Sequence, residues 1–427
     1  MNKKSILLSA AVLMGALTMT SCSSNDDDDN NSNNNNQPTE EQYKNRAYGN
    51  EAIDACSNVV SSLTSANDII AKSNLTTEQE TYLRNVLTSL VDNVIVPTYT
   101  KLADDVEDLE KTLNGLTVKT ITQAQIDKAC ADFKQARLNW EQSEAFLMGA
   151  ASDFDIDPTI DSWPLNRSLL LNYFLGGMND EMLEDASILG FHALEFILFR
   201  NGQNRKVAEL QGNDTYTNFT SISGAQELQY AQTICTLLKQ RCYQLQVAWQ
   251  GETSANAARV AVVKAAGLDY TTEAGLSYGE NLTKAGISGS KSTFTNLKDA
   301  VAQVLSASEG SCVGIANEVG TAKIANPFTA GDIAYVESPY SYNSITDFAD
   351  NLRSVRNVWY GSTNGNVATP SFAKFFEAVN TTTIVEQATL SAIQKISAMP
   401  APFVKYCSVV WGKNFDDPTN WDSTSGE

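Results

Sequence analysis

Amphipathic segments of about twenty to thirty residues recur along most of this chain, whereas the alternating runs of β-branched and aromatic residues typical of strands are scarce. Apolar residues return every three or four positions in these segments, which is the period of a helix that buries one face. The helices expected on this basis lie near residues 40–63, 77–113, 122–149, 180–200, 225–250, 254–267, 290–319, 344–360 and 381–398. The pattern predicts an all-α protein of long antiparallel helices.

Helix N-cap residues and the length of the chain suggest how these helices are grouped. Thr76 and Thr122 each stand directly before polar first-turn residues, as helix N-caps do. About four helices precede a polar stretch at residues 202–224, and a similar number follow it. Because roughly 390 residues are more than one hydrophobic core usually serves, we expect two helical-bundle domains, at 41–212 and 213–427.

A faint internal repeat suggests that the two bundles are related by duplication. Asp132-Phe133 followed by Arg137-Leu138-Asn139-Trp140 resembles Asp347-Phe348 followed by Arg356-Asn357-Val358-Trp359. The spacing inside the two segments differs, and helical periodicity alone gives a similar echo. Duplication is therefore one of two explanations for the likeness.

The first 22 residues are typical of an export signal. Asn2-Lys3-Lys4 supplies positive charge, and residues 6–19 form an apolar stretch too short to span a bilayer stably. The segment ends at Met19-Thr20-Ser21-Cys22, which resembles a bacterial lipobox with methionine where leucine is usual. We expect residues 1–22 to be a lipoprotein signal peptide and Cys22 to carry the lipid.

Residues 23–40 are dominated by asparagine, serine and acidic residues, which cannot bury apolar area, so this segment is expected to be a flexible tether. The run Asp26-Asp27-Asp28-Asp29 behind the lipidated cysteine resembles a surface-export signal of Bacteroidetes lipoproteins. A solvating linker of a periplasmic lipoprotein is the alternative. We favour a bacterial outer-membrane lipoprotein that is exposed at the surface.

Charge and cysteine spacing exclude several classes of protein. The formal net charge of −20 argues against nucleic acid and anionic membrane surfaces as partners, which leaves the lipid anchor as the membrane contact. No C-x-x-C pair occurs, so zinc-ribbon and thioredoxin-like sites are excluded. The cysteines other than Cys22 are expected to be buried small hydrophobes, with disulfide pairing left open.

The only histidine of the chain, His192, lies in the apolar segment 188–199. Glu195 follows three positions later and therefore shares a helix face with it. Glu-x-x-His pairs on inward-facing helices bind metals, and this is the same spacing in reverse order. A buried pair in which the two side chains satisfy each other is the structural alternative. Gly190, costly inside a helix, indicates close approach of another backbone or a ligand.

The segment 122–149 places Arg137, Trp140 and Glu144 on one apolar stripe. Burying a charge is costly unless the charge is paired, and Arg137 and Glu144 are too far apart to form an i, i+4 pair. Either they meet across an interface or Glu144 points into a polar site. In the alternative, the stripe is rotated and Glu144 is solvated at its edge.

The connector at residues 149–165 is rich in aspartate but does not match an EF-hand, because Ile160 stands where the loop needs glycine. A turn-rich connector with an aspartate facing a site is the safer interpretation. No H-E-x-x-H, P-loop or dinucleotide motif occurs in the chain. A Ser-His-Asp triad or a two-histidine zinc site would have to share the single imidazole.

An ordered set of motifs resembles the imelysin family, also catalogued as peptidase M75, from about residue 41 to the C-terminus. The family signature G-x-H-x-x-E is matched by Gly190, His192 and Glu195. The other matching segments are Arg137-x-x-Trp140-x-x-x-Glu144-Ala145-Phe146, Asp161-Ser162-Trp163-Pro164-Leu165, Ser338-Pro339-Tyr340-Ser341, Asp347-Phe348 and Trp359-Tyr360-Gly361. The resemblance implies two helical bundles with the histidine motif near their interface, and an envelope protein associated with iron.

Our hypothesis from sequence is a lipid-anchored protein that binds a metal ion or iron compound in iron acquisition, with an outer-membrane iron-transport partner. The expected ligands are His192, Glu195 and Glu144, a set that suits iron, zinc or manganese. The expected surrounding residues are Arg137, Ser143, Asp161, Trp163 and Gly190.

Two alternatives stay open. One is a metallopeptidase with Glu195 or Glu144 as general base, although H-x-x-E supplies only two of the three ligands of a hydrolytic zinc site. The other is a structural or surface-binding lipoprotein.

Overall fold

The computed structural model describes residues 37–417 and 420–421, and its helices and strands come in the following order. The first half contains α1 (Glu40–Lys44), α2 (Ala47–Lys72), α3 (Thr77–Leu90), η1 (Val91–Ile95), α4 (Val96–Asn114), α5 (Gln123–Glu141), η2 (Glu144–Phe146), α6 (Ala150–Asp153), α7 (Asp157–Asp161), α8 (Arg167–Leu175), η3 (Asp180–Glu184), η4 (Ala186–Ile188), α9 (Gly190–Leu198), β1 (Phe199–Arg200), β2 (Gln203–Asn204) and α10 (Val207–Gln211). The second half contains α11 (Gly224–Gln250), α12 (Ala257–Ala265), α13 (Tyr278–Thr283), α14 (Leu297–Ser306), α15 (Cys312–Glu318), η5 (Val319–Ala330), η6 (Ile333–Tyr335), α16 (Ser344–Tyr360), α17 (Phe372–Ala378), α18 (Val385–Ser397) and α19 (Phe403–Val410). The prediction of an all-α protein is confirmed.

The signal peptide at residues 1–22, with Cys22, lies outside the described residues, as does most of the tether at 23–40. Their export, lipidation and flexibility stay predictions. Within residues 37–417 and 420–421, no helix combines the length and apolar content needed to cross a bilayer.

Local signals explain where the long helices begin. The side chains of Thr76, Thr122 and Ser223 each accept a hydrogen bond from the backbone N–H of the third residue of the following helix. That residue is a glutamine, and its side-chain oxygen accepts a hydrogen bond from the cap backbone N–H. A single π-helical segment, η1, joins α3 to α4, so that helical backbone runs from Thr77 to Asn114. This agrees with the predicted helix over 77–113.

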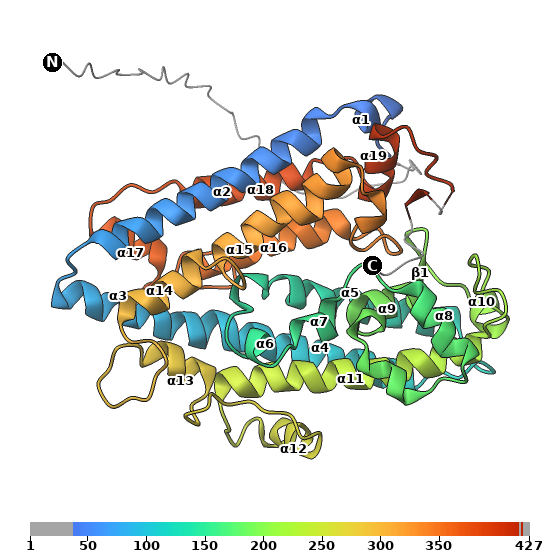
Figure 1. Cartoon of the computed structure of the whole chain (residues 1–427), viewed down its shortest axis with the longest axis horizontal. Coiled ribbons are helices and arrows are strands. Elements are labelled where there is room, and N and C mark those ends of the chain that lie inside the picture. The colour runs from blue at the N-terminus through green and yellow to red at the C-terminus, as the bar shows by residue number, and fades with distance from the viewer. Residues whose placement is uncertain (1–36, 418–419, 422–427) are drawn as a thin grey trace, which may run out of the picture. The chain divides into compact units, whose positions relative to one another are not determined.

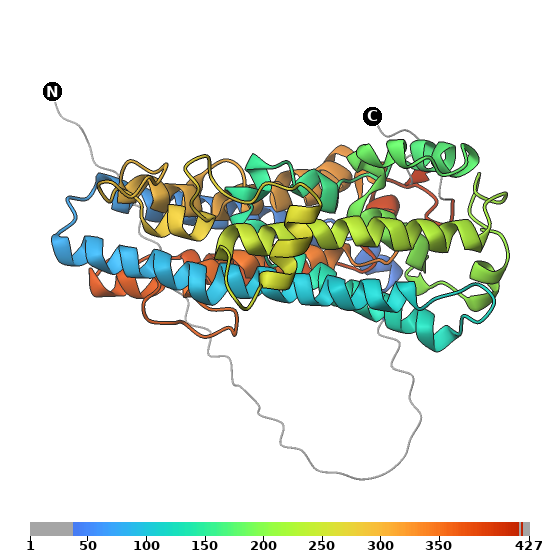
Figure 2. The ribbon, with the colours of Figure 1, turned by 90° about the horizontal axis from the view of Figure 1, so that it is seen from below.

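The long helices form two layers that run side by side (Figures 1 and 2). In one layer α2 packs against α14, α15 and α18, and α16 packs against α15 and α18. In the other layer α4 lies between α5 and α11, and α9 packs against both α5 and α11. Contacts of α16 with α5 and η2 join the layers. The candidate site lies at this junction.

The described residues from 38 onward belong to one compact unit by their contacts. Both layers combine elements from before and after residue 212: α2 packs on helices of the second half, and α11 packs on α4 and α9 of the first. The division at 212 and 213 stays a prediction, as does duplication. The two similar segments fall on α5 and α16, which contact each other.

Several predicted helices begin, end or divide elsewhere, among them the one expected at 40–63, which is divided into α1 and α2 and runs to Lys72. The helix expected at 122–149 ends at Glu141, where the Ser143 hydroxyl donates to the carbonyl of Trp140 at 2.7 Å and the chain turns into η2. The helix expected at 180–200 begins only at Gly190, after two short 3-10 turns capped by Asn179 and Asp185. The helix expected at 290–319 is divided into α14 and α15. In each case polar side chains form hydrogen bonds that end or start a helix inside the segment where apolar periodicity predicts a continuous one.

Candidate functional site

Arg137 of α5 lies at the centre of a buried charge cluster where the two layers meet. Its guanidinium pairs with Asp161 of α7 and lies 2.5 Å from carboxylate oxygens of Glu141 and Glu337. Asp347 of α16 lies 3.7 Å from Arg137 Nε. The arginine is only 1% exposed, so each of these charge pairs is shielded from water. The stripe on α5 therefore does carry a buried charge, and its helical partner is Glu141 rather than Glu144.

His192 is held from both ring nitrogens. Its Nδ1 lies 3.2 Å from Glu195 Oε2, and its Nε2 lies 3.1 Å from Asp161 Oδ1. The other oxygen of Glu195, Oε1, accepts hydrogen bonds from the backbone nitrogens of Tyr340 at 3.1 Å and Ser341 at 2.7 Å. Glu195 thus fixes the imidazole and ties α9 to the segment before α16.

Asp161 and Lys323 lie at one edge of this cluster. Asp161 Oδ2 accepts a hydrogen bond from Trp140 Nε1 at 2.7 Å, so both oxygens of Asp161 are engaged. The Lys323 ammonium lies 3.2 Å from Glu337 Oε2 and 5.2 Å from the centre of the Trp163 ring. The Trp163 indole in turn donates to the carbonyl of Tyr335 at 3.3 Å.

Burial and ion pairing shift the acidity of these groups in opposite directions. Burial and Arg137 lower the pKa of His192, but its hydrogen bonds to Asp161 and Glu195 outweigh them and raise that pKa to about 9. Burial raises the pKa of Asp161, but Arg137 and His192 outweigh it and hold that pKa well below its usual range. Burial raises the pKa of Asp347 to about 7 and that of Glu141 well above its usual range.

Gly190 stands where α9 meets α7. Its φ is +72°, and a Cβ built on it would lie 2.1 Å from the carbonyl oxygen of Ile160. The close approach expected from the sequence is therefore an approach of the α7 backbone. It allows α9 to bring His192 beside Asp161 at the end of α7.

Gly190→Ala should destabilise the protein by about 2 kcal/mol or more, because the new methyl group meets backbone that cannot move aside and φ is unfavourable. Gly177→Ala is a matched control, since its φ is +83° with no atom within 4 Å of the new Cβ. The control should cost about 1 kcal/mol from φ alone. Urea denaturation measures both, and equal losses would contradict the steric explanation.

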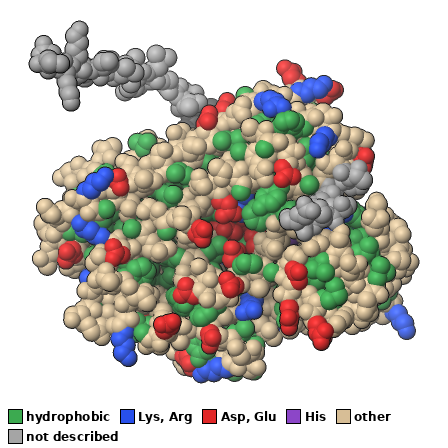
Figure 3. Space-filling view, in the orientation of Figure 1, with side chains coloured by type: hydrophobic (Ala, Val, Ile, Leu, Met, Phe, Trp, Pro, Cys, Tyr) green, Lys and Arg blue, Asp and Glu red, His purple; other side chains and the backbone are tan. Residues whose placement is uncertain are grey.

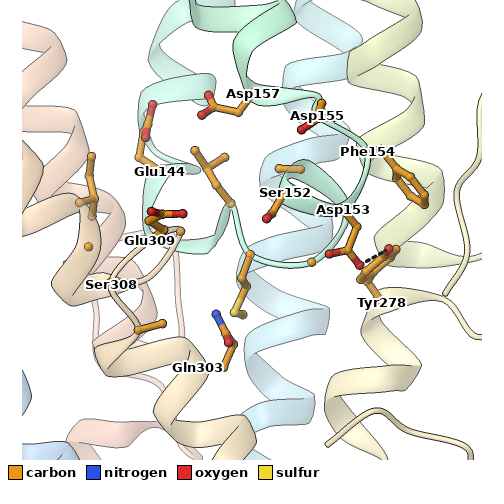
Figure 4. Close-up of a pocket in the computed structure, with 18 of the residues that line it drawn as sticks. Glu144, Ser152, Asp153, Phe154, Asp155, Asp157, Tyr278, Gln303, Ser308 and Glu309 are labelled. Atoms are coloured by element: carbon orange, nitrogen blue, oxygen red, sulfur yellow. Dashed lines mark hydrogen bonds between the residues drawn. The ribbon is translucent and has the colours of Figure 1, made fainter. Parts of the chain in front are cut away.

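A cavity of 1430 Å³ lies on the other side of Asp161 and Lys323. The acidic residues that line it are Glu144, Asp153, Asp155, Asp157, Asp161, Glu273, Glu309 and Glu318. Lys323 is the only basic residue among the described residues of its lining. Figure 3 shows acidic side chains gathered at the middle of the face, and Figure 4 shows Glu144 and Asp157 directed toward each other at one end of the pocket.

The described residues contain three groups whose carboxylate or imidazole atoms converge within 4.8 Å. These are Asp161, His192 and Glu337; Glu141, Glu337 and Asp347; and Glu141, Glu144 and Asp161. The predicted set of His192, Glu195 and Glu144 is not one of them. Glu144 converges with Glu141 and Asp161 rather than with His192 and also lines the cavity from η2, and Ser143 caps the end of α5.

The donor set fits a metal ion. Glu141 Oε1 and Glu337 Oε2 are buried and lack an aligned hydrogen bond, although each is near a cation. Carboxylate and imidazole groups are ligands for iron, zinc and manganese. Metal ligation by any of these residues stays a prediction.

Sequence reasoning missed Glu141, Lys323, Glu337 and Asp347. Glu141 could have been found, because it stands four residues after Arg137 on the same helix face. Asp347 stands in the Asp347-Phe348 segment that resembles the family, but that resemblance assigned it no role. Lys323 and Glu337 carried no local signal, since they come from η5 and from the loop before α16.

Comparison with known proteins gives consistent results. The family model described as imelysin, peptidase M75, matches residues 95–416. Iron-regulated protein A of Synechococcus elongatus is 25% identical over 314 residues, which cover 73% of this chain and 74% of that protein. A solved structure described as an iron-regulated protein A precursor from Parabacteroides distasonis has a TM-score of 0.58 at 22% identity, covering 80% of this chain and 96% of that one. An imelysin-like protein from Psychrobacter arcticum has a TM-score of 0.46 at 13% identity, covering 82% and 98%.

Proposed function

Since this chain belongs to the imelysin family, we propose that it is a lipid-anchored envelope protein that binds a metal ion or iron compound in iron acquisition. The main support is that possible ligand atoms of Asp161, His192 and Glu337 lie within 4.8 Å of one another, and all three residues are buried. An iron-related role is supported by the likeness to iron-regulated protein A. The anchor at Cys22, the outer-membrane location and an iron-transport partner belong to the same proposal.

The ligands in this proposal are His192 Nε2 and carboxylate oxygens of Asp161 and Glu337. Glu195 has the supporting role, because a carboxylate that accepts the Nδ1 proton leaves Nε2 free for a metal. The pair therefore serves as one ligand and its positioning partner, rather than as two ligands. The Arg137 guanidinium lies 3.4 Å from His192 Nε2, so a bound cation must share these carboxylates with it.

Metal binding should depend on His192 and on pH. We expect His192→Gln to weaken Mn²⁺ or Zn²⁺ binding about 10–100-fold. Affinity of the wild-type protein should rise between pH 7 and pH 9, because an ion must displace a proton from a ring whose pKa is raised to about 9. Titration calorimetry on metal-free protein measures both effects.

Asp105→Asn is the matched control. Asp105 is a half-buried carboxylate that accepts a hydrogen bond from Asn139 at 2.5 Å, and it lies outside all three convergent groups. This variant should bind metal as the wild type does. Equal stoichiometry and affinity for wild type and His192→Gln would refute the assignment.

A further inference from the structure

The cavity in front of Asp161 and Lys323 presents carboxylates that are not ligands in the proposed site of Asp161, His192 and Glu337. Glu144 comes from η2, Asp157 begins α7 and Glu318 ends α15, and all three line the cavity. Glu144 and Asp157 are directed toward each other (Figure 4), and burial raises the pKa of Glu144, Asp157 and Glu318. Three different elements thus direct carboxyl groups into one space, and a bound cation would stabilise their charged forms.

Glu144 is the least satisfied of these groups. It is only 5% exposed, and within the described part of the chain no hydrogen bond or ion pair engages its carboxylate. Lys323, the nearby cation, is directed at Glu337, with Nζ at 3.3 Å from Oε1 and 3.2 Å from Oε2. Its distance to Glu318 is 3.9 Å. A buried carboxylate without a partner is costly, and burial raises the pKa of Glu144 well above its usual range although Lys323 acts against this. A cation in the cavity would hold Glu144 in its charged form.

The spacing and the volume indicate the size of that ligand. Asp157 and Glu318 belong to none of the described groups that converge within 4.8 Å, so the three carboxylates do not close around a bare ion. The cavity of 1430 Å³ has room for many times the roughly 30 Å³ of one water molecule. A cation that donates hydrogen bonds from its own outer shell suits both observations.

We propose that this cavity binds a multiply charged cation that keeps its own ligand shell, through hydrogen bonds to Glu144, Asp157 and Glu318. The ligand class is a complexed metal ion or a polyamine, which share a surface of positively charged N–H or O–H donors. The proposal rests on the proposed function for its cargo, an iron compound. It adds a second site, separated from His192 by Asp161 and Lys323.

Hexaamminecobalt(III) tests this site, because its ammine ligands do not exchange and it cannot be ligated by His192. We expect the full chain to bind it with one-to-one stoichiometry in titration calorimetry. Glu144→Gln and Asp157→Asn should each weaken binding about 10-fold, the scale of one charge-assisted hydrogen bond. Spermidine, titrated in parallel, distinguishes a polyamine from a complexed metal ion as the preferred ligand.

Glu80→Gln is the control, since it removes one negative charge from an exposed position of α3 that does not line the cavity. It should leave affinity unchanged. Equal weakening by Glu80→Gln and the cavity variants would mean attraction to net charge and would overturn the proposal, as would absence of binding. If Glu144→Gln fails to fold, Asp157→Asn and Glu318→Gln decide the outcome. Mn²⁺ binding that depends on His192 would persist if only this second site failed.

Discussion

Arg137→Met should lower the free energy of unfolding by about 3–5 kcal/mol, because removing one partner of a buried ion pair leaves the opposite charges uncompensated. Arg137 contacts Asp161, Glu141 and Glu337 at once and is 1% exposed. Methionine is unbranched and shorter than arginine, so the space left by the guanidinium group adds to this loss. The effect should be smaller at pH 5 than at pH 8, because protonation of the neighbouring carboxyl groups removes their charge.

Urea denaturation followed by circular dichroism measures this loss. Arg259→Met is a suitable comparison, because Arg259 pairs with Asp104, whose side chain is 60% exposed. An exposed partner stays solvated when its cation is removed, so this variant should lose no more than about 1 kcal/mol. Similar losses for the two arginines would show that the Arg137 cluster is not energetically special.

The free energy of unfolding should fall as pH rises from 5 to 9, by an amount on the order of 2–4 kcal/mol, since one pKa unit corresponds to about 1.4 kcal/mol. Burial raises the pKa of Asp347 to about 7. Between the pKa of Asp347 in the unfolded chain and its pKa of about 7 in the native state, the native state binds the proton more tightly. The free energy of unfolding therefore falls as pH rises toward 7.

His192 extends the same trend to higher pH. Hydrogen bonds to Asp161 and Glu195 outweigh burial and Arg137 and raise its pKa to about 9. A protonated imidazole with this raised pKa stabilises the native state fully below its unfolded pKa and loses that contribution as pH rises through 9. Asp161, with its pKa lowered, acts in the opposite direction only below about pH 4.

Two substitutions separate these contributions. Asp347→Asn should flatten the stability profile from pH 5 to 7, and His192→Gln should flatten it from pH 7 to 9. Urea midpoints at pH 5, 7 and 9 for the three proteins measure the profile. A wild-type maximum near pH 7, unaffected by either substitution, would contradict the shifts on which the prediction rests.

Most long helices were predictable because their signals are local. The caps at Thr76 and Thr122 and the apolar period of each segment lie within a few turns of chain. The end of α5 at Glu141 was not predicted, because the apolar stripe continues through Glu144 and Leu147 while the Ser143 hydroxyl bonds back to Trp140. One side-chain hydrogen bond thus separated Glu144 from the helix of Arg137.

The sequence by itself determined the all-α architecture and the shared face of His192 and Glu195, because helical geometry relates residues three and four apart. Only the tertiary structure decided which charges meet. Glu337 reaches Arg137 across 200 residues, and Lys323 enters from η5 with no motif around it. A buried charge is stabilised by the opposite charges that packing brings close to it. The partners of Arg137 and the position of Glu144 between this cluster and the cavity therefore follow from the assembled layers.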